Sequence, residues 1–150
     1  MNNKIKTYAI AAIAAMTVVS CDSYKDSENP DKIVEVDKNL SGTWQLQNVK
    51  RNGIDISTAM DFSKFKLHLE ETGRYMLENR LPFPVSEDGT WSVDDPAHPF
   101  SLSFAEDNVA GESVDVDIQY PIVEGERQLS ITHSPGCEIN SYEYVFVKVN

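Results

Sequence analysis

Residues 114–120 have the sequence VDVDIQY, and this stretch decides the fold class because apolar and polar side chains alternate along it. Val114, Val116 and Ile118 fall on one face of an extended chain, while the aspartates between them fall on the other. This period of two is typical of a strand with one buried and one solvated face. It predicts an antiparallel sheet, since sheets of that kind often face water on one side.

The pattern continues on both sides of this stretch, in short segments separated by turn residues such as Asn52-Gly53. Residues 57–62 are expected to form a short helix, with Ser57 as its N-cap. Residues 80–88 are excluded from a central strand because their two prolines lack the backbone donor that a ladder needs. Strands are predicted at 42–51, 64–71, 75–78, 89–93, 100–104, 114–120, 128–132 and 141–149, with a further edge strand at 33–36.

Eight main strands without a long helix predict an all-β domain, and we expect an eight-stranded antiparallel up-and-down barrel. At this number of strands, side chains can fill the interior, or the interior can hold one small ligand. Closure also removes the exposed strand edges that would promote aggregation. A two-sheet β-sandwich is the alternative, because a count of strands does not distinguish the two architectures.

The first predicted strand opens with Gly42-Thr43-Trp44, the Gly-x-Trp pattern of lipocalins. The surrounding sequence resembles the small lipocalin-like lipoproteins of Gram-negative bacteria, many of which are known only as a domain of unknown function. The resemblance covers about residues 40–149 and implies a lipocalin-like barrel. It also implies that Trp44 closes one barrel end and that Lys148, from the last strand, packs over its ring. The stretches that carry it are SGTWQLQNVKRNGIDI (41–56), FKLHLEETGRYML (65–77), LPFPVSEDGTWSVDDP (81–96) and YEYVFVKV (142–149).

The first 20 residues have the three parts of a secretory signal peptide. Two lysines precede the apolar run of residues 8–19, which is too short for a bilayer span of about 20 residues. Val-Val-Ser-Cys at 18–21 resembles the lipobox of bacterial lipoproteins, which implies cleavage before Cys21 and attachment of a diacylglycerol to its sulfur. Two or three acyl chains would anchor the chain stably to a membrane. The alternative is an ordinary signal peptide, with Cys21 as an incidental thiol.

We therefore expect a signal peptide at 1–20, a lipidated cysteine with an acidic flexible tether at 21–39, and a lipocalin-like β-barrel domain at 40–150. Cleavage removes two lysines and no acidic residue, which leaves 11 basic and 24 acidic residues and a formal charge of −13. This charge argues against a nucleic-acid partner. The membrane is the expected partner through the lipid anchor. The predicted location is the cell envelope, at the periplasmic or the surface leaflet of the outer membrane.

No arrangement of residues points to catalysis, so the protein is expected not to be an enzyme and to use no cofactor or metal. The three histidines lie in different segments, without the spacing of a metal site. Turn chemistry explains Asp94 and Asp95, and a solvated strand face explains Asp115 and Asp117, better than calcium binding does. Cys137 has no basic neighbour that would activate its thiol.

The aromatic residues of the predicted strands carry the main functional question. They are expected first of all to be barrel core, with Phe100 and Phe146 among the lining. A ligand cup is the functional alternative, with residues 81–84 at its mouth, because loops on a rigid scaffold often bind ligands. The ligand-binding candidates are Phe65, Tyr75, Phe83, Trp91, Phe104 and Tyr120.

Three functions remain open at this point. The leading hypothesis is a membrane-anchored, lipocalin-like lipoprotein that binds a small apolar molecule, a glycan or another extended ligand at the barrel mouth or loops. The second is an accessory or structural subunit that docks on an outer-membrane protein complex, such as a nutrient-uptake system. The third is an inhibitor that blocks hydrolases with its loops.

Overall fold

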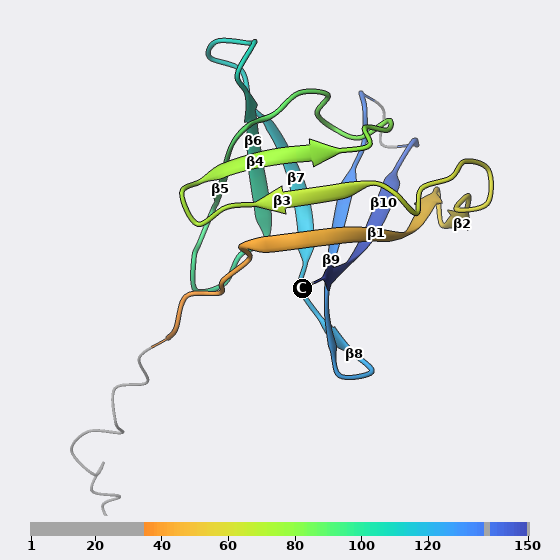
Figure 1. Cartoon of the computed structure of the whole chain (residues 1–150), viewed down its shortest axis with the longest axis horizontal. Helices are drawn as coiled ribbons and strands as arrows, with labels where there is room; N and C mark the ends of the chain where they lie inside the picture. The colour runs from red at the N-terminus through yellow and green to blue at the C-terminus, as the bar shows by residue number, and fades with distance from the viewer. Residues whose placement is uncertain (1–34, 137–138, 150) are drawn as a thin grey trace, which may run out of the picture. The chain divides into compact units, whose positions relative to one another are not determined.

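A computed structural model describes residues 35–136 and 139–149 of the chain. These residues form ten strands and no helix (Figure 1). The predicted signal peptide, Cys21, the tether up to residue 34 and Cys137 lie outside the described residues. The strands are β1 (Gly42–Arg51), β2 (Ile54–Asp55), β3 (Lys66–Leu69), β4 (Arg74–Glu78), β5 (Gly89–Val93), β6 (Ser101–Glu106), β7 (Val114–Gln119), β8 (Ile122–Val123), β9 (Glu126–His133) and β10 (Tyr142–Val149).

Eight of these strands form a closed antiparallel barrel with up-and-down connectivity, which confirms the predicted fold class over the sandwich. Strands follow one another around the barrel in the order β1-β3-β4-β5-β6-β7-β9-β10, and β10 closes the ring against β1 (Figure 1). The two extra strands are short. β2 pairs only with the far part of β1, and β8 pairs only with the start of β9.

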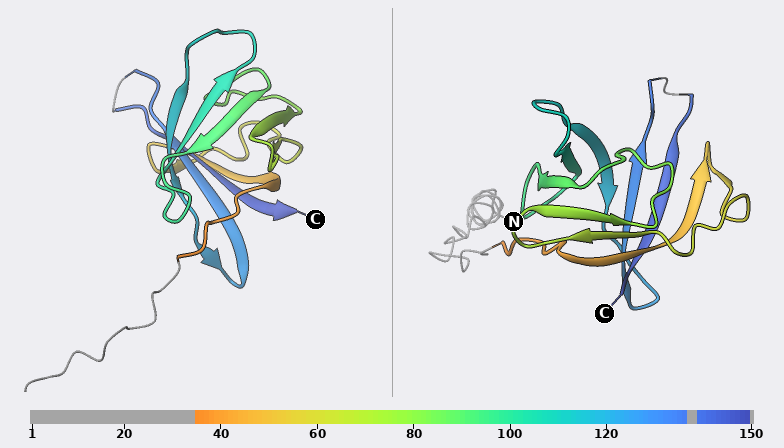
Figure 2. Two further views of the ribbon diagram at one scale, coloured as in Figure 1. Left: turned by 90° about the vertical axis from the view of Figure 1, so that its left-hand side faces the viewer. Right: turned by 45° about the horizontal axis from the view of Figure 1, so that its top comes forward.

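The up-and-down connectivity sorts the loops into two groups. Residues 35–41, 70–73, 94–100 and 120–125 gather at one end, here named the entry end because the described chain begins there (Figure 2). Residues 52–65, 79–88 and 107–113 gather at the opposite end, here named the mouth.

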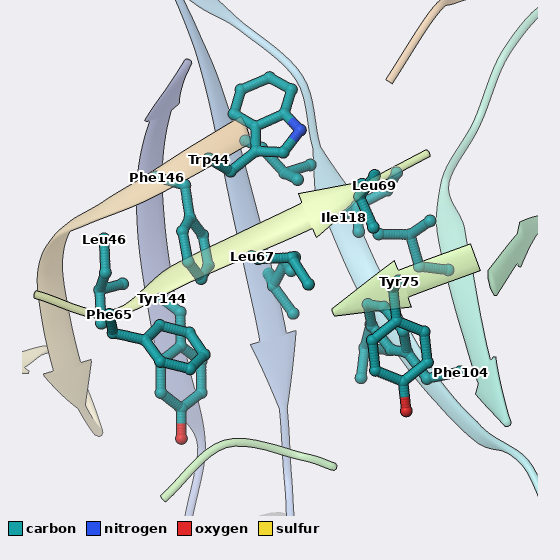
Figure 3. Packing of buried hydrophobic residues seen from close by; sticks show 14 of the residues in the cluster. Trp44, Leu46, Phe65, Leu67, Leu69, Tyr75, Phe104, Ile118, Tyr144 and Phe146 are labelled. Atoms are coloured by element: carbon teal, nitrogen blue, oxygen red, sulfur yellow. The ribbon is translucent and has the colours of Figure 1, made fainter. Parts of the chain in front are cut away.

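Alternation along the strands fills the barrel from all sides. In β7, Val116 and Ile118 are buried while Asp115 and Asp117 are exposed, as expected from the period of two. The buried side chains form one continuous core (Figure 3). Its largest fully buried members are Trp44, Tyr75, Phe65, Phe104 and Phe146.

Closure of the barrel depends on the long pairing of β1 with β10. It runs from Thr43 opposite Val149 to Arg51 opposite Tyr142, with a register shift between Leu46 and Asn48. A bulge of this kind increases local twist and bends the strand, which a closed barrel needs.

Three local predictions are wrong. Residues 57–62 form turns rather than a helix, because Ser57 bonds instead to the neighbouring strand: its Oγ accepts a hydrogen bond from the Val49 N–H at 3.0 Å. Residues 35–36 of the predicted edge strand are not in a strand. Phe100 points into solvent rather than into the lining. The Asp94 carboxylate accepts hydrogen bonds from the Phe100 and Ser101 N–H groups and turns the chain there, before β6 begins.

Candidate functional site

Trp44 closes the entry end of the barrel. Its ring is fully buried, and its Nε1–H donates a hydrogen bond to the Leu40 carbonyl oxygen at 2.8 Å. The Lys148 ammonium lies 5.6 Å from the centre of the Trp44 ring and donates to the Ser41 carbonyl oxygen at 2.6 Å. The indole is therefore held by a backbone hydrogen bond at its Nε1 and by a cation over its ring.

Tyr120 and Trp91 also lie at the entry end. The Tyr120 ring packs edge-on against Trp44, with ring centres 5.9 Å apart, and its hydroxyl donates to the Asn39 carbonyl oxygen at 3.0 Å. The Arg127 guanidinium covers the Tyr120 ring at 4.5 Å. Burial raises the pKa of Tyr120, so the hydroxyl stays a neutral donor. Trp91 is half-buried, and its Nε1–H donates to the Glu70 carbonyl oxygen at 3.1 Å.

Phe83 closes the mouth. It comes from the connection between β4 and β5 and contacts four aromatic rings of the core. The ring centres lie 5.3 Å from Phe65, 6.0 Å from Phe104, 5.2 Å from Tyr144 and 6.1 Å from Phe146. Edge-on and tilted arrangements of this kind are the favourable geometries for aromatic pairs. Phe83 therefore fills the place where a cup would open.

Hydrogen bonds fasten residues 80–88 across the mouth. The Tyr144 hydroxyl donates to the Pro82 carbonyl oxygen at 3.1 Å, and burial raises the pKa of Tyr144 to about 12. The Glu106 carboxylate accepts from the Ser86 N–H and from the Glu87 N–H, the latter at 3.0 Å. These donors hold the pKa of Glu106 below its ordinary value, with the Ser86 N–H as the largest cause.

Two tyrosine hydroxyls point from the core toward the mouth, those of Tyr75 and Tyr144 (Figure 3). Tyr75 is fully buried and packs edge-on against Phe104, with ring centres 5.0 Å apart. Its hydroxyl has no hydrogen-bond partner among the described residues. Burial raises the pKa of Tyr75, which keeps the hydroxyl neutral.

The six ligand-binding candidates do not surround a common cavity. Trp91 and Tyr120 lie at the entry end, while the other four are packed in or over the mouth half of the core. Two of them, Phe83 and Phe104, also face a hollow of about 290 Å³ on the rim, here named the mouth groove. The mouth groove is lined by Phe83, Pro84, Ser86, Phe104, Glu106, Val109, Glu112, Ser113 and Val114.

One wall of the mouth groove was not predicted from the sequence. It consists of Val109, Glu112 and Ser113, in the connection between β6 and β7, together with Val114. The sequence shows this connection only as a loop, since nothing in it marks a ligand contact. Its position beside residues 83–86 follows from the pairing of β5 with β6, because residues 83–86 precede β5 and the loop follows β6. The Arg74 guanidinium also holds the start of this loop, by two hydrogen bonds to the Asp107 carboxylate at 2.8 and 2.7 Å.

Three of the four carboxylates that were considered for calcium have protein partners. Asp94 Oδ1 accepts two backbone N–H groups, and Asp95 Oδ1 accepts the Ala97 N–H at 2.9 Å. Asp115 accepts a hydrogen bond from the Ser103 hydroxyl. No group of three metal-ligating side chains occurs in residues 35–136 and 139–149. That same part of the chain contains no helix able to span a membrane.

A family model described as a domain of unknown function (DUF5004) matches residues 22–147. Neither a curated protein nor a solved structure matches the chain. The match begins directly after Cys21 and ends near the end of β10, so it covers β1 to β9 and most of β10.

Proposed function

The chain belongs to the DUF5004 family of unknown function, and from its own residues we propose that it is a lipocalin-like lipoprotein of the bacterial cell envelope that binds a ligand without catalysis. Cys21 carries the lipid anchor, and the mouth groove holds the ligand. The observation that supports this site is the filled barrel. Phe83 closes the mouth and Trp44 closes the entry end, so a ligand has to contact the rim rather than the interior.

The proposed anchor rests on the sequence Val-Val-Ser-Cys at residues 18–21, after a short apolar run. A diacylglycerol on Cys21, with a further acyl chain on its amine, binds a bilayer stably where one chain alone is marginal. Residues 22–34 then connect the anchor to the barrel. The outer membrane is the proposed location.

The proposed ligand is small or extended and presents an apolar surface to Phe83, Val109 and Val114. Pockets for small ligands begin at about 300 Å³, so the mouth groove suits one ring or one segment of a longer molecule. Ser86 and Ser113 offer polar contacts beside the apolar wall. Because Glu106 and Glu112 also line the mouth groove, a neutral or cationic ligand fits it better than an anionic one.

Fatty-acid labelling tests the anchor. In the bacterium, the native chain is expected to incorporate an alkyne-tagged palmitate analogue, and Cys21→Ser is expected to lose the label completely because no sulfur remains to be acylated. Cys137→Ser serves as the matched control and should keep the label. Retained labelling of the Cys21→Ser chain would contradict the anchor.

Titration with Nile red, a neutral apolar dye, tests the mouth groove. We expect Val109→Glu to weaken binding of the dye about tenfold, because a charge replaces apolar surface on the groove wall. Ile54→Glu places the same charge at an apolar position that is also exposed, at the mouth but outside the groove, and should bind as the native chain does. Equal weakening in both variants, or no binding by the native chain, would contradict the ligand site.

A further inference from the structure

Four large apolar side chains are exposed at the entry end of the barrel, and they are here named the entry patch. Their exposed fractions are 73% for Val36, 71% for Phe100, 62% for Ile122 and 40% for Val123. Single exposed apolar residues are common on protein surfaces, whereas a group of them on one face indicates contact with another apolar surface.

Specific contacts bring two segments of the entry patch together. The Lys38 N–H donates to the Pro96 carbonyl oxygen at 2.7 Å, and His98 Nδ1 lies 3.5 Å from the Glu35 carboxylate. These contacts hold the segment that carries Val36 beside the loop that carries Phe100. Phe100 also lines a shallow, mainly apolar hollow, together with Tyr120 and Pro121.

Ile122 and Val123 reach beyond the barrel wall. They form β8, which pairs only with Arg127 and Glu126 at the start of β9 (Figure 2). This two-stranded ribbon projects from the entry end of the barrel (Figures 1 and 2). Isolated two-stranded ribbons are marginally stable in water, and this one carries two exposed β-branched residues. Their burial in an apolar phase would favour the ribbon.

The connection toward Cys21 also joins the barrel at this end. Glu35 is the first described residue, so residues 22–34 separate the barrel from Cys21. At about 3.5 Å per residue, they span at most about 45 Å. A chain anchored at Cys21 therefore keeps the entry end within reach of the bilayer at a high effective concentration.

The charges around the entry patch select the kind of lipid. Glu35, Asp37, Glu124 and Glu126 outnumber Lys38 and Arg127 in the same segments. Anionic headgroups would repel this surface, whereas zwitterionic headgroups would not. Contact by insertion of apolar side chains is then favoured over electrostatic attraction.

We infer that the entry end is a membrane-contact face, whose entry patch inserts into a zwitterionic lipid surface. The inference rests on the proposed lipid anchor and extends it, because it assigns the domain an orientation. The entry end faces the bilayer, and the mouth groove, at the opposite end of the barrel, faces away from it. A lipid anchor alone would leave the domain to rotate on its connection.

Quenching by brominated lipid tests this orientation. The full lipidated chain is inserted through its anchor into vesicles of phosphatidylcholine with brominated acyl chains. Phe100→Trp places a reporter in the entry patch, and Ile54→Trp places one at the mouth with nearly the same exposed fraction, 70% against 71%. After subtraction of the native signal from Trp44 and Trp91, we expect the Phe100→Trp emission to fall by about half and the Ile54→Trp emission to stay unchanged.

Flotation of the vesicles separates the two possible failures. Chains that do not float with the vesicles would overturn the lipid anchor and this inference together. Chains that float without quenching at position 100, or with equal quenching at both positions, would overturn the orientation and leave the anchor standing. A blue shift at position 100 that grows with protein concentration in the absence of lipid would assign the entry patch to a second copy of the chain instead.

Replacement of half the lipid by phosphatidylglycerol should weaken the quenching, and stronger quenching would overturn the preference for zwitterionic lipid.

Discussion

At the scale of single residues, the Gly-x-Trp opening of β1 has a physical cause. Gly42 has a φ of 141°, and a Cβ on it would clash with the Lys148 side chain. The missing side chain lets Lys148 cross β1, reach the Ser41 carbonyl oxygen and cover the Trp44 ring. Glycine, tryptophan and lysine therefore act as one unit that closes the entry end.

We expect Lys148→Met to lower the free energy of unfolding by about 0.5–1 kcal/mol, because the cation–π contact and one hydrogen bond are lost while the aliphatic stem remains. Thermal unfolding followed by the emission of Trp44 measures the change. Lys64→Met is the matched control, because Lys64 lies on the surface away from Trp44, and it should unfold as the native chain does. Equal effects of the two substitutions would contradict the assigned role of Lys148.

At the scale of elements, residues 80–88 form a plug over the mouth and not a strand. Pro82 and Pro84 prevent the segment from joining the sheet as a ladder partner, and Phe83 between them enters the mouth. The Glu106 carboxylate at the end of β6 binds the backbone N–H groups of residues 86 and 87 and so ties the plug to the barrel. The mouth groove lies directly beside this tie, so its shape depends on the charge of Glu106.

The charge of Glu106 predicts a pH dependence. Its pKa is lowered from the ordinary value of 4.5 by bonds to its charged form, so its contribution to stability is present above that value. The contribution is lost as the pH falls through the lower pKa of the folded state. Glu106→Gln is therefore expected to unfold at a lower urea concentration than the native chain at pH 7, and the difference should shrink as the pH approaches about 3.

Glu112→Gln is the control for this experiment, because it removes a neighbouring charge that also lines the mouth groove but accepts no hydrogen bond from residues 86 and 87. Its urea midpoint should follow that of the native chain at every pH. A difference between native and Glu106→Gln chains that is constant from pH 7 to pH 3 would show that the carboxylate charge does not stabilise the plug.

At the scale of the whole molecule, closure is the step on which the other features depend. β10 pairs with β1 on one side and with β9 on the other, so the last strand joins the two ends of the sheet. Pairs such as Thr43 with Val149 bring together residues from opposite ends of the domain. Contacts between residues so distant in sequence cost much chain entropy before they contribute to the stability of the fold. This predicts slow, cooperative folding.

Val145, in the middle of β10, tests the importance of closure, because it lies opposite Asn48 of β1 and Ser130 of β9. We expect Val145→Pro to abolish cooperative unfolding and the near-ultraviolet circular dichroism of the core, since proline breaks the central ladder. Val145→Ala keeps the backbone donor and should cost only about 1 kcal/mol. If the two variants melt alike, closure through β10 does not limit stability.

The strands were predictable from the sequence because alternation and turn chemistry are local. The predicted bounds of the first strand and of residues 89–93 match β1 and β5. The first six residues of VDVDIQY form β7 with their aspartates exposed. The prediction of a helix at 57–62 is wrong because the Ser57 hydroxyl accepts a hydrogen bond from Val49 in β1 and does not cap its own segment. The local pattern carried no information about that partner.

The sequence by itself determined the class of the fold, since a period of two over eight short segments specifies strands that bury one face. Only the tertiary structure decided what the aromatic residues do. From the sequence, Phe83 was a loop residue with two alternative roles, ligand binding or packing. In the structure it fills the mouth, because Phe65, Phe104 and Tyr144 contact it from three different strands or loops. Such convergence depends on how the closed ring brings distant segments together, whereas periodicity depends only on neighbours along the chain.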